Sequence, residues 1–311
     1  MEFFHRPTNF PFMATRKVWY TLSIILMVGS FISFATSGLN LAIDFTGGVT
    51  VEATLSKTAD IDAIRERLEE SGFKEPQVQN FGSSRDVAIR LPPDPSQTGP
   101  VIRAKVETAL KTIDPGAQIL RLEVVGPQVG QELKTSAIYA LGFTLLFIFI
   151  YIAFRFHTWR LSLGAIAAVM HDPILVLGIF SITQTPFDLA VVAAILAVVG
   201  YSLNDTVVVF DRIRERFEHN RRLAPSVVLD QSINQTLSRT IMTKVVTAIV
   251  VVALLFLGGP VLRGFSEALM IGILAGTYSS IYISSAIALD CGLTAEHLFP
   301  SVKKAAVDEL P

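Results

Sequence analysis

The sequence predicts a polytopic α-helical membrane protein with six transmembrane helices and one soluble α+β insert between the first two. Two properties of the 311-residue chain indicate this class: 51% of the residues are hydrophobic, and the mean hydropathy is +0.51. Such a chain is too apolar for an ordinary soluble domain. With 17% charged residues it is also too polar to lie entirely in a membrane. The net charge of −1 does not indicate nucleic-acid binding, and we expect no such partner.

Six apolar runs are long enough to cross a bilayer. We expect transmembrane helices at 18–38, 134–154, 161–182, 188–210, 239–257 and 266–289. Residues 1–17 precede the first helix, residues 211–238 form a polar amphipathic connection, and residues 290–311 form a tail. We interpret the first run as a retained span and not a cleaved secretory signal, because it has no short apolar core and five further runs follow.

Residues 39–133 differ in character from the apolar runs, with alternating apolar residues and frequent Pro and Gly. Alternation predicts strands at 49–55, 87–91 and 120–124, and a weaker strand at 77–81. Helical spacing predicts helices beginning at Ile61 and Ile102. The resulting order βαββαβ is that of the ferredoxin-like split arrangement. Such a domain is a scaffold and does not by itself indicate a function.

The positions of lysine and arginine predict the orientation. Bases cluster in the N-terminal segment, at 155–160, in the connection 211–238 and at Lys303 and Lys304 of the tail, whereas the turns at 183–188 and 258–265 have few. Lys and Arg concentrate on the cytoplasmic side of membrane proteins. We therefore expect both termini in the cytoplasm and the insert on the outer side.

The fourth predicted span contains a carboxylate, Asp205, well before the charged cluster that begins at Asp211. At 1.5 Å per residue, Asp205 lies about 9 Å inside that point. A carboxylate at such a depth costs about 2.5 to 3.5 kcal/mol and is tolerated mainly when it faces protein and has a partner. Ser202, Asn204 and Thr206 place further polar groups around it. We interpret Asp205 as a site whose protonation matters, with a structural hydrogen bond between helices as the alternative.

Arg239, at the start of the fifth span, is expected at the same end of the bundle as Asp205. A guanidinium beside a carboxylate favours the ionised acid. A pair of Asp205 and Arg239 that forms and breaks is therefore a hypothesis for a proton switch. The alternative is that Arg239 only extends to lipid phosphates.

His171 and Asp172 lie near the middle of the third span. As neighbours on a helix they point about 100° apart, so we do not expect both to face one partner. An aspartate in mid-span requires a function or a buried bond. Asp172 is thus either a proton relay or a structural lock, and Pro173 after it is expected to kink the helix.

Small residues recur at every fourth position of the sixth span and permit a close helix contact: Ala268, Gly272, Gly276, Ser280, Ser284 and Ala288. The segment AIDFTGG ends in Gly47 and Gly48, which suit a tight turn where the first span meets the insert. Asp44 in this segment could cap a helix or form a salt bridge. We find no phosphate-binding loop, zinc-ligand spacing or nucleophile with a base, and we expect no cofactor, no metal and no enzymatic activity.

Several of these segments together resemble the SecF family. SecF is a subunit of the bacterial SecDF protein-export complex, and its periplasmic domain is smaller than that of SecD. The resemblance covers residues 34–289 and is carried by AIDFTGG, the HD of the third span, VGYSLNDTVVVFDRIRER, QTLSRT, FLGGPVLRGF and GILAGTYSSIYISSA. Ala42 stands where the family commonly has Gly. The resemblance implies half of an RND-like transporter, and it places the family's proton-pathway acid on Asp205 and its arginine on Arg239.

The same resemblance implies the cellular setting. It places the chain in the bacterial inner membrane, in contact with lipid, with the insert in the periplasm. It implies SecD as the heterodimer partner, and it implies the SecYEG translocon, YajC, YidC and preprotein substrates as further partners. Inward proton flow would help to pull preproteins through SecYEG.

Three other functions are compatible with parts of the pattern. Half of an RND-type small-molecule antiporter would share the acid in the fourth span, but two large outer loops are expected there and this chain has one modest insert. A purely structural subunit that stabilises SecD is a second alternative. An intramembrane aspartyl protease built on Asp172 and Asp205 is the weakest, because the context SLND lacks a glycine-flanked aspartate.

Overall fold

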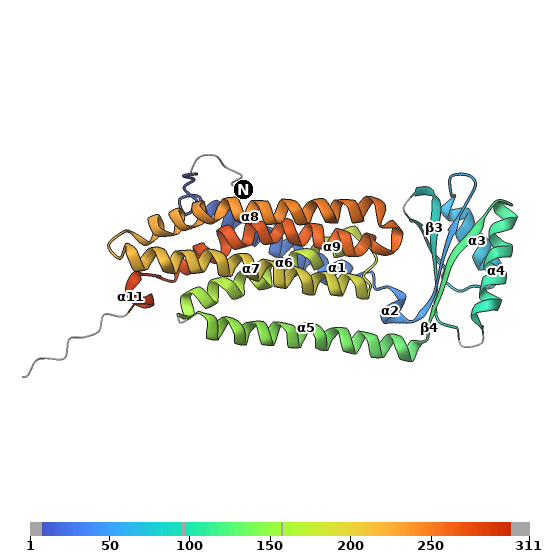
Figure 1. Ribbon diagram of the computed structural model, residues 1–311. Coiled ribbons are helices and arrows are strands. Elements are labelled where there is room, and N and C mark those ends of the chain that lie inside the picture. Colours follow the sequence, from blue (N-terminus) through green and yellow to red (C-terminus); the bar gives the residue numbers. More distant parts are fainter. Residues whose placement is uncertain (1–7, 82, 95–96, 157, 300–311) are drawn as a thin grey trace, which may run out of the picture.

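The computed structural model describes residues 8–81, 83–94, 97–156 and 158–299, and its two parts are arranged end to end (Figure 1). A long helical bundle forms one part, and a four-stranded sheet with its helices forms the other. We call the end of the bundle next to the sheet the domain end and the opposite end the far end. The predicted basic residues Lys303 and Lys304 lie outside the described residues.

Within the described ranges, six helical segments are long and apolar enough to cross a membrane, which confirms the predicted fold class. Five are single helices, and the sixth is made of α9, a π-helical turn η1 and α10. Their bounds are α1 (Arg16–Ser37), α5 (Pro127–Arg155), α6 (Trp159–Thr183), α7 (Leu189–His219), α8 (Pro225–Leu257), α9 (Gly259–Tyr278), η1 (Ser279–Ile283) and α10 (Ser284–Asp290), with short helices α2 (Ile43–Thr46) and α11 (Ala295–Leu298) beside them.

Helices α7 and α8 extend beyond the apolar stretches from which the fourth and fifth spans are predicted. The connection predicted at 211–238 is therefore mostly helical: it consists of the end of α7, a short turn and the start of α8. An amphipathic sequence is what such an extension requires, because one of its faces packs on the bundle and the other faces water. Where the membrane boundaries cut these helices remains a prediction.

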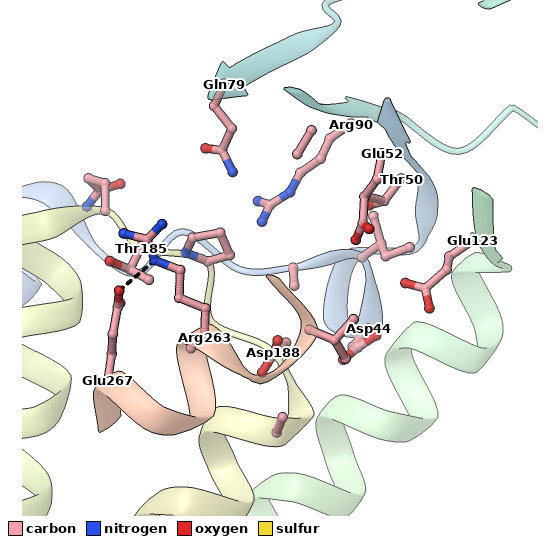
Figure 2. A pocket seen from close by; sticks show the side chains of 18 of the residues that line it. Asp44, Thr50, Glu52, Gln79, Arg90, Glu123, Thr185, Asp188, Arg263 and Glu267 are labelled. Atoms are coloured by element: carbon pink, nitrogen blue, oxygen red, sulfur yellow. Dashed lines mark hydrogen bonds and ion pairs between the residues drawn. The ribbon is translucent and has the colours of Figure 1, made fainter. Parts of the chain in front are cut away.

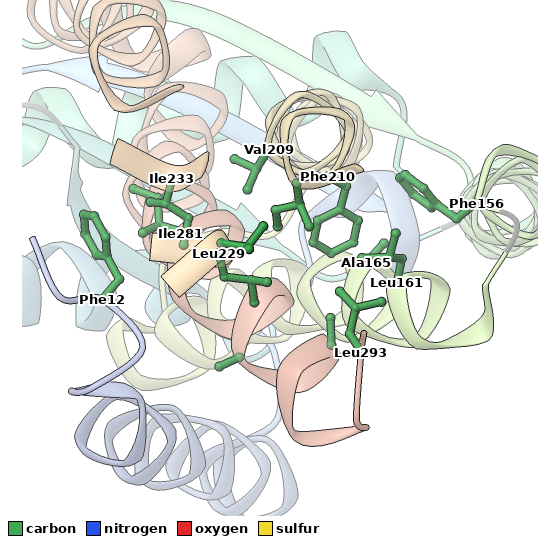
Figure 3. Close-up of a cluster of buried hydrophobic side chains, with 14 of the residues drawn as sticks. Phe12, Phe156, Leu161, Ala165, Val209, Phe210, Leu229, Ile233, Ile281 and Leu293 are labelled. Carbon is green, nitrogen blue, oxygen red and sulfur yellow. The ribbon is translucent and has the colours of Figure 1, made fainter. Parts of the chain in front are cut away.

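Burial divides the six segments into central and peripheral ones. In the most apolar stretch of each segment, the share of residues that are buried is 56% for α6 and α7 and 61% for the sixth segment, against 11% for α1 and α5 and 17% for α8. The bundle has an apolar cluster toward each end. The far-end cluster, shown in Figure 3, includes Phe156, Leu161, Phe210, Ile233 and Ile281, and the domain-end cluster includes Phe45, Val176, Phe180, Val191 and Ile195.

The small residues of the sixth segment do allow a close helix contact. A Cβ atom on Gly272 would lie 2.1 Å from Val198 Cγ2 on α7, and one on Gly276 would lie 3.2 Å from Asp172 Oδ2 on α6. The π-helical turn η1 that interrupts this segment is not predicted by its sequence pattern. Such turns occur as single insertions within α-helices, frequently at functional sites.

The insert has the predicted βαββαβ order. Its elements are β1 (Gly48–Thr54), α3 (Ile61–Glu70), β2 (Gln77–Phe81), β3 (Ser83–Leu91), α4 (Gly99–Ile113) and β4 (Gln118–Val125). The strands pair antiparallel in the order β2-β3-β1-β4, and both helices lie on the face away from the bundle (Figure 1). Val51 and Ile89 of the sheet pack against Leu68 and Val106 of the helices.

The junction between α1 and the sheet depends on the two glycines of AIDFTGG. Gly47 and Gly48 have φ angles of +70° and +123°, and a Cβ atom on Gly48 would lie 2.5 Å from the carbonyl oxygen of Leu91. The predicted tight turn is thus confirmed. Asp44 Oδ2 accepts a hydrogen bond of 3.0 Å from Leu189 N, so this carboxylate caps the start of α7.

A polar cavity of about 430 Å³ separates the sheet from the domain end of the bundle. Figure 2 shows that Glu52 and Arg90 enter it from the sheet, and Asp188 and Arg263 from the bundle. Arg90 also donates a hydrogen bond of 2.8 Å from Nη1 to Asn40 Oδ1 in the segment that links the two parts. The face of the sheet that its own helices leave uncovered is therefore charged and faces the bundle.

Candidate functional site

Asp205 faces protein and has a charged partner, Lys244 of α8. The residue is 5% exposed, and its Oδ2 lies 2.7 Å from Lys244 Nζ, which is also buried. The two atoms are in ionic contact, although their angles are not those of a hydrogen bond. In such a pair each charge offsets the other, and removal of either partner leaves an uncompensated buried charge. The predicted burial of Asp205 against a neighbouring helix is confirmed.

The sequence suggests Arg239 as the partner of Asp205, whereas the cation beside Asp205 in this structure is Lys244. Arg239 is exposed and lines a shallow pocket of about 350 Å³ together with Asp211 and Glu215. Because α7 and α8 run antiparallel, Arg239 is level with Asp211, and Lys244 lies five residues further, about 7.5 Å along the axis, level with Asp205. The sequence contained a signal for this pair, since Lys244 is an isolated charge inside an apolar run, as Asp205 is.

Only part of the predicted polar surroundings of Asp205 lies on its side of α7. Ser202 is 1% exposed and its Oγ has no hydrogen-bond partner among the described residues, and the buried Thr206 donates to the Ser202 carbonyl oxygen at 3.1 Å. Asn204 is exposed on another face of α7. Next to it, Tyr201 places its ring 5.2 Å from Lys244 Nζ. Asn204 does not line the pair, because one residue along a helix turns the side chain by about 100°.

His171 and Asp172 form one hydrogen-bonded group, contrary to the expectation that they point apart. His171 Nδ1 lies 2.9 Å from Asp172 Oδ1, and the two residues are 4% and 0% exposed. Their Cα–Cβ bonds diverge, but rotation about the side-chain torsions brings the two polar ends together. Ser279 of η1 donates to Asp172 Oδ2 at 2.9 Å, and Ser23 Oγ of α1 lies 3.2 Å from His171 Nε2.

The remaining predicted site residues lie where they support the fold. Asp44, Gly47 and Gly48 form the junction with the insert, and Gly272 and Gly276 lie in helix contacts, as described above. In the ranges that the structure describes, no group of three or more His, Cys, Asp or Glu residues is arranged to hold a metal ion.

Comparison with known families gives two matches along the chain. The model for the C-terminal region of the protein export membrane proteins SecD and SecF matches residues 105–294. The model for the SecD/SecF GG motif matches residues 32–59, which include the glycine turn and Asp44. Together the matched ranges contain the buried pair, the His–Asp group and the junction.

Individual proteins are similar over nearly the full length. The protein translocase subunit SecF of Haemophilus influenzae is 49% identical over 300 residues, which are 96% of this chain and 91% of that protein. The subunit of the same name from Escherichia coli O157:H7 is 42% identical, over 93% of this chain and 90% of that protein. A crystal structure of SecDF, a translocon-associated membrane protein from Thermus thermophilus, superposes with a TM-score of 0.83 at 37% identity, over 91% of this chain and 39% of that longer chain.

Proposed function

The chain belongs to the SecF family of protein translocase subunits, and we propose that it couples inward proton flow to preprotein export through the Asp205–Lys244 pair. The chain is a multi-pass membrane protein with an accessory role in Sec-dependent protein translocation, a transport role and not an enzymatic one. The proton coupling and its residues are the proposed part.

The observation that carries the proposal is the ion pair buried between α7 and α8. When Asp205 binds a proton it becomes neutral, and Lys244 is left as a buried charge without its partner. The two helices then have a different preferred arrangement from the one that the charged pair stabilises. A proton can shift a conformational equilibrium only through such a difference between two states.

The membrane potential supplies enough energy for this step. One charge that crosses the membrane gains about 2.3 kcal/mol per 100 mV. A few protons per cycle would therefore bias a movement of the bundle by several kcal/mol. Asp44 caps α7 from the junction with the insert, so α7 connects Asp205 directly with the outer domain.

SecD is the partner within the Sec system that the SecF relatives and the SecDF structure support. The exposed face of α7 fits such a partner. Asn204 is exposed within an apolar helix, and a polar side chain there is best satisfied by a facing transmembrane helix. Tyr201 beside it is 41% exposed, although its hydroxyl group already contacts Thr247 Oγ1 of α8 at 2.6 Å. We propose that SecD covers this face. Contacts with SecYEG, YajC and YidC are part of the same proposal.

We also propose the bacterial inner membrane as the location, with both termini in the cytoplasm and the domain end in the periplasm. The base-rich segments at the far end support this orientation. Arg239 belongs to that end, and its proposed role is to keep the far side of α7 and α8 accessible to water beside Asp211.

The test is Asp205→Asn in vesicles that contain this chain, SecD and SecYEG. We expect the complex to assemble and preprotein release to lose its dependence on the proton gradient, because asparagine cannot titrate. Asp211→Asn is the matched control: the same change on the same helix, at a half-exposed carboxylate that pairs with Arg155. Normal proton-dependent release by the Asp205→Asn complex would contradict the proposed coupling. The function left for this chain would then be a structural one, the stabilisation of SecD.

A further inference from the structure

The His171–Asp172 group is a buried ionisable cluster that the Asp205–Lys244 pair does not explain. Among the described residues, no Lys or Arg lies within ion-pair distance of Asp172. The titratable side chain that faces the group from the sixth segment is Tyr278, whose ring centroid lies 5.6 Å from that of His171. Helix α1 faces it with Ser23, and α7 with Ser202. In the arrangement that the structure shows, the charges of this group are therefore balanced by the group's own side chains.

The hydrogen bonds determine where the protons lie. Tyr278 has one hydroxyl proton and donates it to the carbonyl oxygen of Trp19 at 2.6 Å. In its short contact with Ser23, Tyr278 must then be the acceptor, so the proton of Ser23 is used there. In its contact with His171 Nε2, Ser23 Oγ can then act only as the acceptor. His171 Nε2 is the donor and therefore carries a hydrogen. The tautomer is thus assigned from the network around the ring.

The contact between His171 Nδ1 and Asp172 Oδ1 then requires a second proton. Two acceptors cannot form a hydrogen bond, so a proton lies between Nδ1 and Oδ1, on the ring or on the carboxyl group. Asp172 Oδ2 accepts from Ser279 and supplies no proton to this contact. The pair therefore holds one proton more than a neutral histidine beside a carboxylate, and it is neutral as a whole, as burial without a cation requires.

We propose that the His171–Asp172 pair is a second proton-binding site, which loads from the domain end and passes its proton to Asp205. This inference rests on the proposed function of Asp205. Both α6 and α7 meet at the turn at the domain end. Counted from there at 1.5 Å per residue, Asp172 lies about 17 Å and Asp205 about 24 Å along its helix, so a proton from that end reaches Asp172 first.

Gly276 and Ser202 connect the two sites. A Cβ atom on Gly276 would lie 3.2 Å from Asp172 Oδ2 and 3.4 Å from Ser202 Cβ. The side chains of Asp172 and Ser202 therefore border the same small space, which is open because residue 276 is a glycine. Ser202 Oγ is buried and has no hydrogen-bond partner among the described residues. A hydroxyl group can accept one proton while it donates another. Ser202 is also one helical turn from Asp205, on the same side of α7.

The transfer conserves protons and total charge. The proton leaves the Nδ1–Oδ1 hydrogen bond and is received by the carboxylate of Asp205. The His171–Asp172 pair then changes from neutral to −1, and the Asp205–Lys244 pair changes from neutral to +1. Ser279 lies in the π-helical turn of the sixth segment, so the charge on Asp172 also acts on that segment through its hydrogen bond.

The first test measures the histidine ring directly, by ¹⁵N NMR of histidine-labelled wild-type complex with SecD in lipid vesicles. His171→Gln assigns the signal among the five histidines of the chain. We expect a protonated Nε2 and an Nδ1 in a strong hydrogen bond, with loss of one proton as the pH rises. An unprotonated Nε2, or ring signals that do not change over the pH range in which transport changes, would overturn the proposal.

The second test is proton-dependent preprotein release by Asp172→Asn. Asparagine keeps an acceptor for Ser279 and a donor for His171 Nδ1, so a structural lock tolerates the change and a proton site does not. We expect release to fall by about tenfold or more. Ser285→Ala is the control, because it removes a buried hydroxyl group that has no hydrogen-bond partner among the described residues; it should stay within about twofold.

Gly276→Ala is the third variant, since it fills the space between Asp172 and Ser202 and leaves both carboxylates in place. We expect a loss of release similar to that of Asp172→Asn. If Asp205→Asn abolishes coupling while Asp172→Asn retains it, the second site is wrong and the role of Asp205 stands. If Asp205→Asn itself retains coupling, the proposed function fails. Should Asp172→Asn not assemble, the NMR measurement on the wild-type complex decides.

Discussion

The insert and the helical bundle distribute polar and apolar side chains in opposite ways. In the insert, Val51 and Ile89 are fully buried, and the ion pairs lie at the surface. In the bundle, large apolar side chains such as Phe147 and Ile249 are 65% and 63% exposed, while Asp205 with Lys244 and His171 with Asp172 lie inside. One chain thus contains two domains built for two solvents.

The difference teaches what holds each part together. Water favours the burial of apolar surface, and the core of the insert follows from that. Lipid tails are as apolar as leucine, so they give helices no such reason to associate. Close contacts at small residues and internal polar groups then specify how the helices pack. In the bundle these polar groups are also the ones that we propose to bind protons.

Breaking one ion pair in the bundle and one in the insert should give the largest difference in the loss of stability. Lys244→Met leaves Asp205 buried without a cation, and we expect a loss of about 3 to 5 kcal/mol in the free energy of unfolding. Lys111→Met breaks a pair with Glu107 that is as short, 2.6 Å. The side chains of Lys111 and Glu107 are 52% and 42% exposed, so water screens the pair and we expect a much smaller loss. Unfolding of the chain in detergent micelles measures both, and equal losses would contradict the comparison.

Truncation of apolar side chains should give the reverse contrast. Leu68→Ala removes a fully buried side chain from the core of the insert and should cost about 2 to 5 kcal/mol. Ile249→Ala on α8 changes an exposed side chain of a membrane-spanning helix, and we expect a loss of less than about 1 kcal/mol if lipid surrounds it. Hydrogen exchange across residues 48–125 measures the loss of stability in Leu68→Ala, and thermal unfolding measures it in Ile249→Ala. A comparable loss at Ile249 would mean that another protein surface covers this face.

The smallest expected effect is a pH dependence of the insert. The hydroxyl group of Ser56 and the N–H of Gly116 donate to Asp114 and hold its pKa below the ordinary value. A lowered pKa contributes stability that is fully present above the unfolded value, about 3.9, and is lost as the pH falls through the folded one.

The difference in stability between wild type and Asp114→Asn, measured by hydrogen exchange of the insert, should therefore be constant near neutral pH and shrink in acid. Ser56→Ala removes the first donor and should reduce the difference throughout. A difference that does not change between neutral pH and pH 3 would contradict this assignment of the hydrogen bonds.

The sequence by itself determined the class of the protein, its six apolar segments, the βαββαβ insert, the glycine turn and the burial of Asp205. These are properties of composition and of periodicity along one segment. Each follows from one segment alone, without knowledge of the segments that pack against it. A long run of apolar residues predicts a membrane span, and an alternating run predicts a strand with one face in a core. An isolated carboxylate in such a run must likewise face protein.

Only the tertiary structure decided which polar groups meet. The choice between Arg239 and Lys244 as the partner of Asp205 depends on how far two antiparallel helices are shifted along their axes. The bond between His171 and Asp172 depends on side-chain torsions, and the exposure of Asn204 depends on the rotation of α7. Shift, torsion and rotation result from packing among several helices at once, and no single segment contains that information.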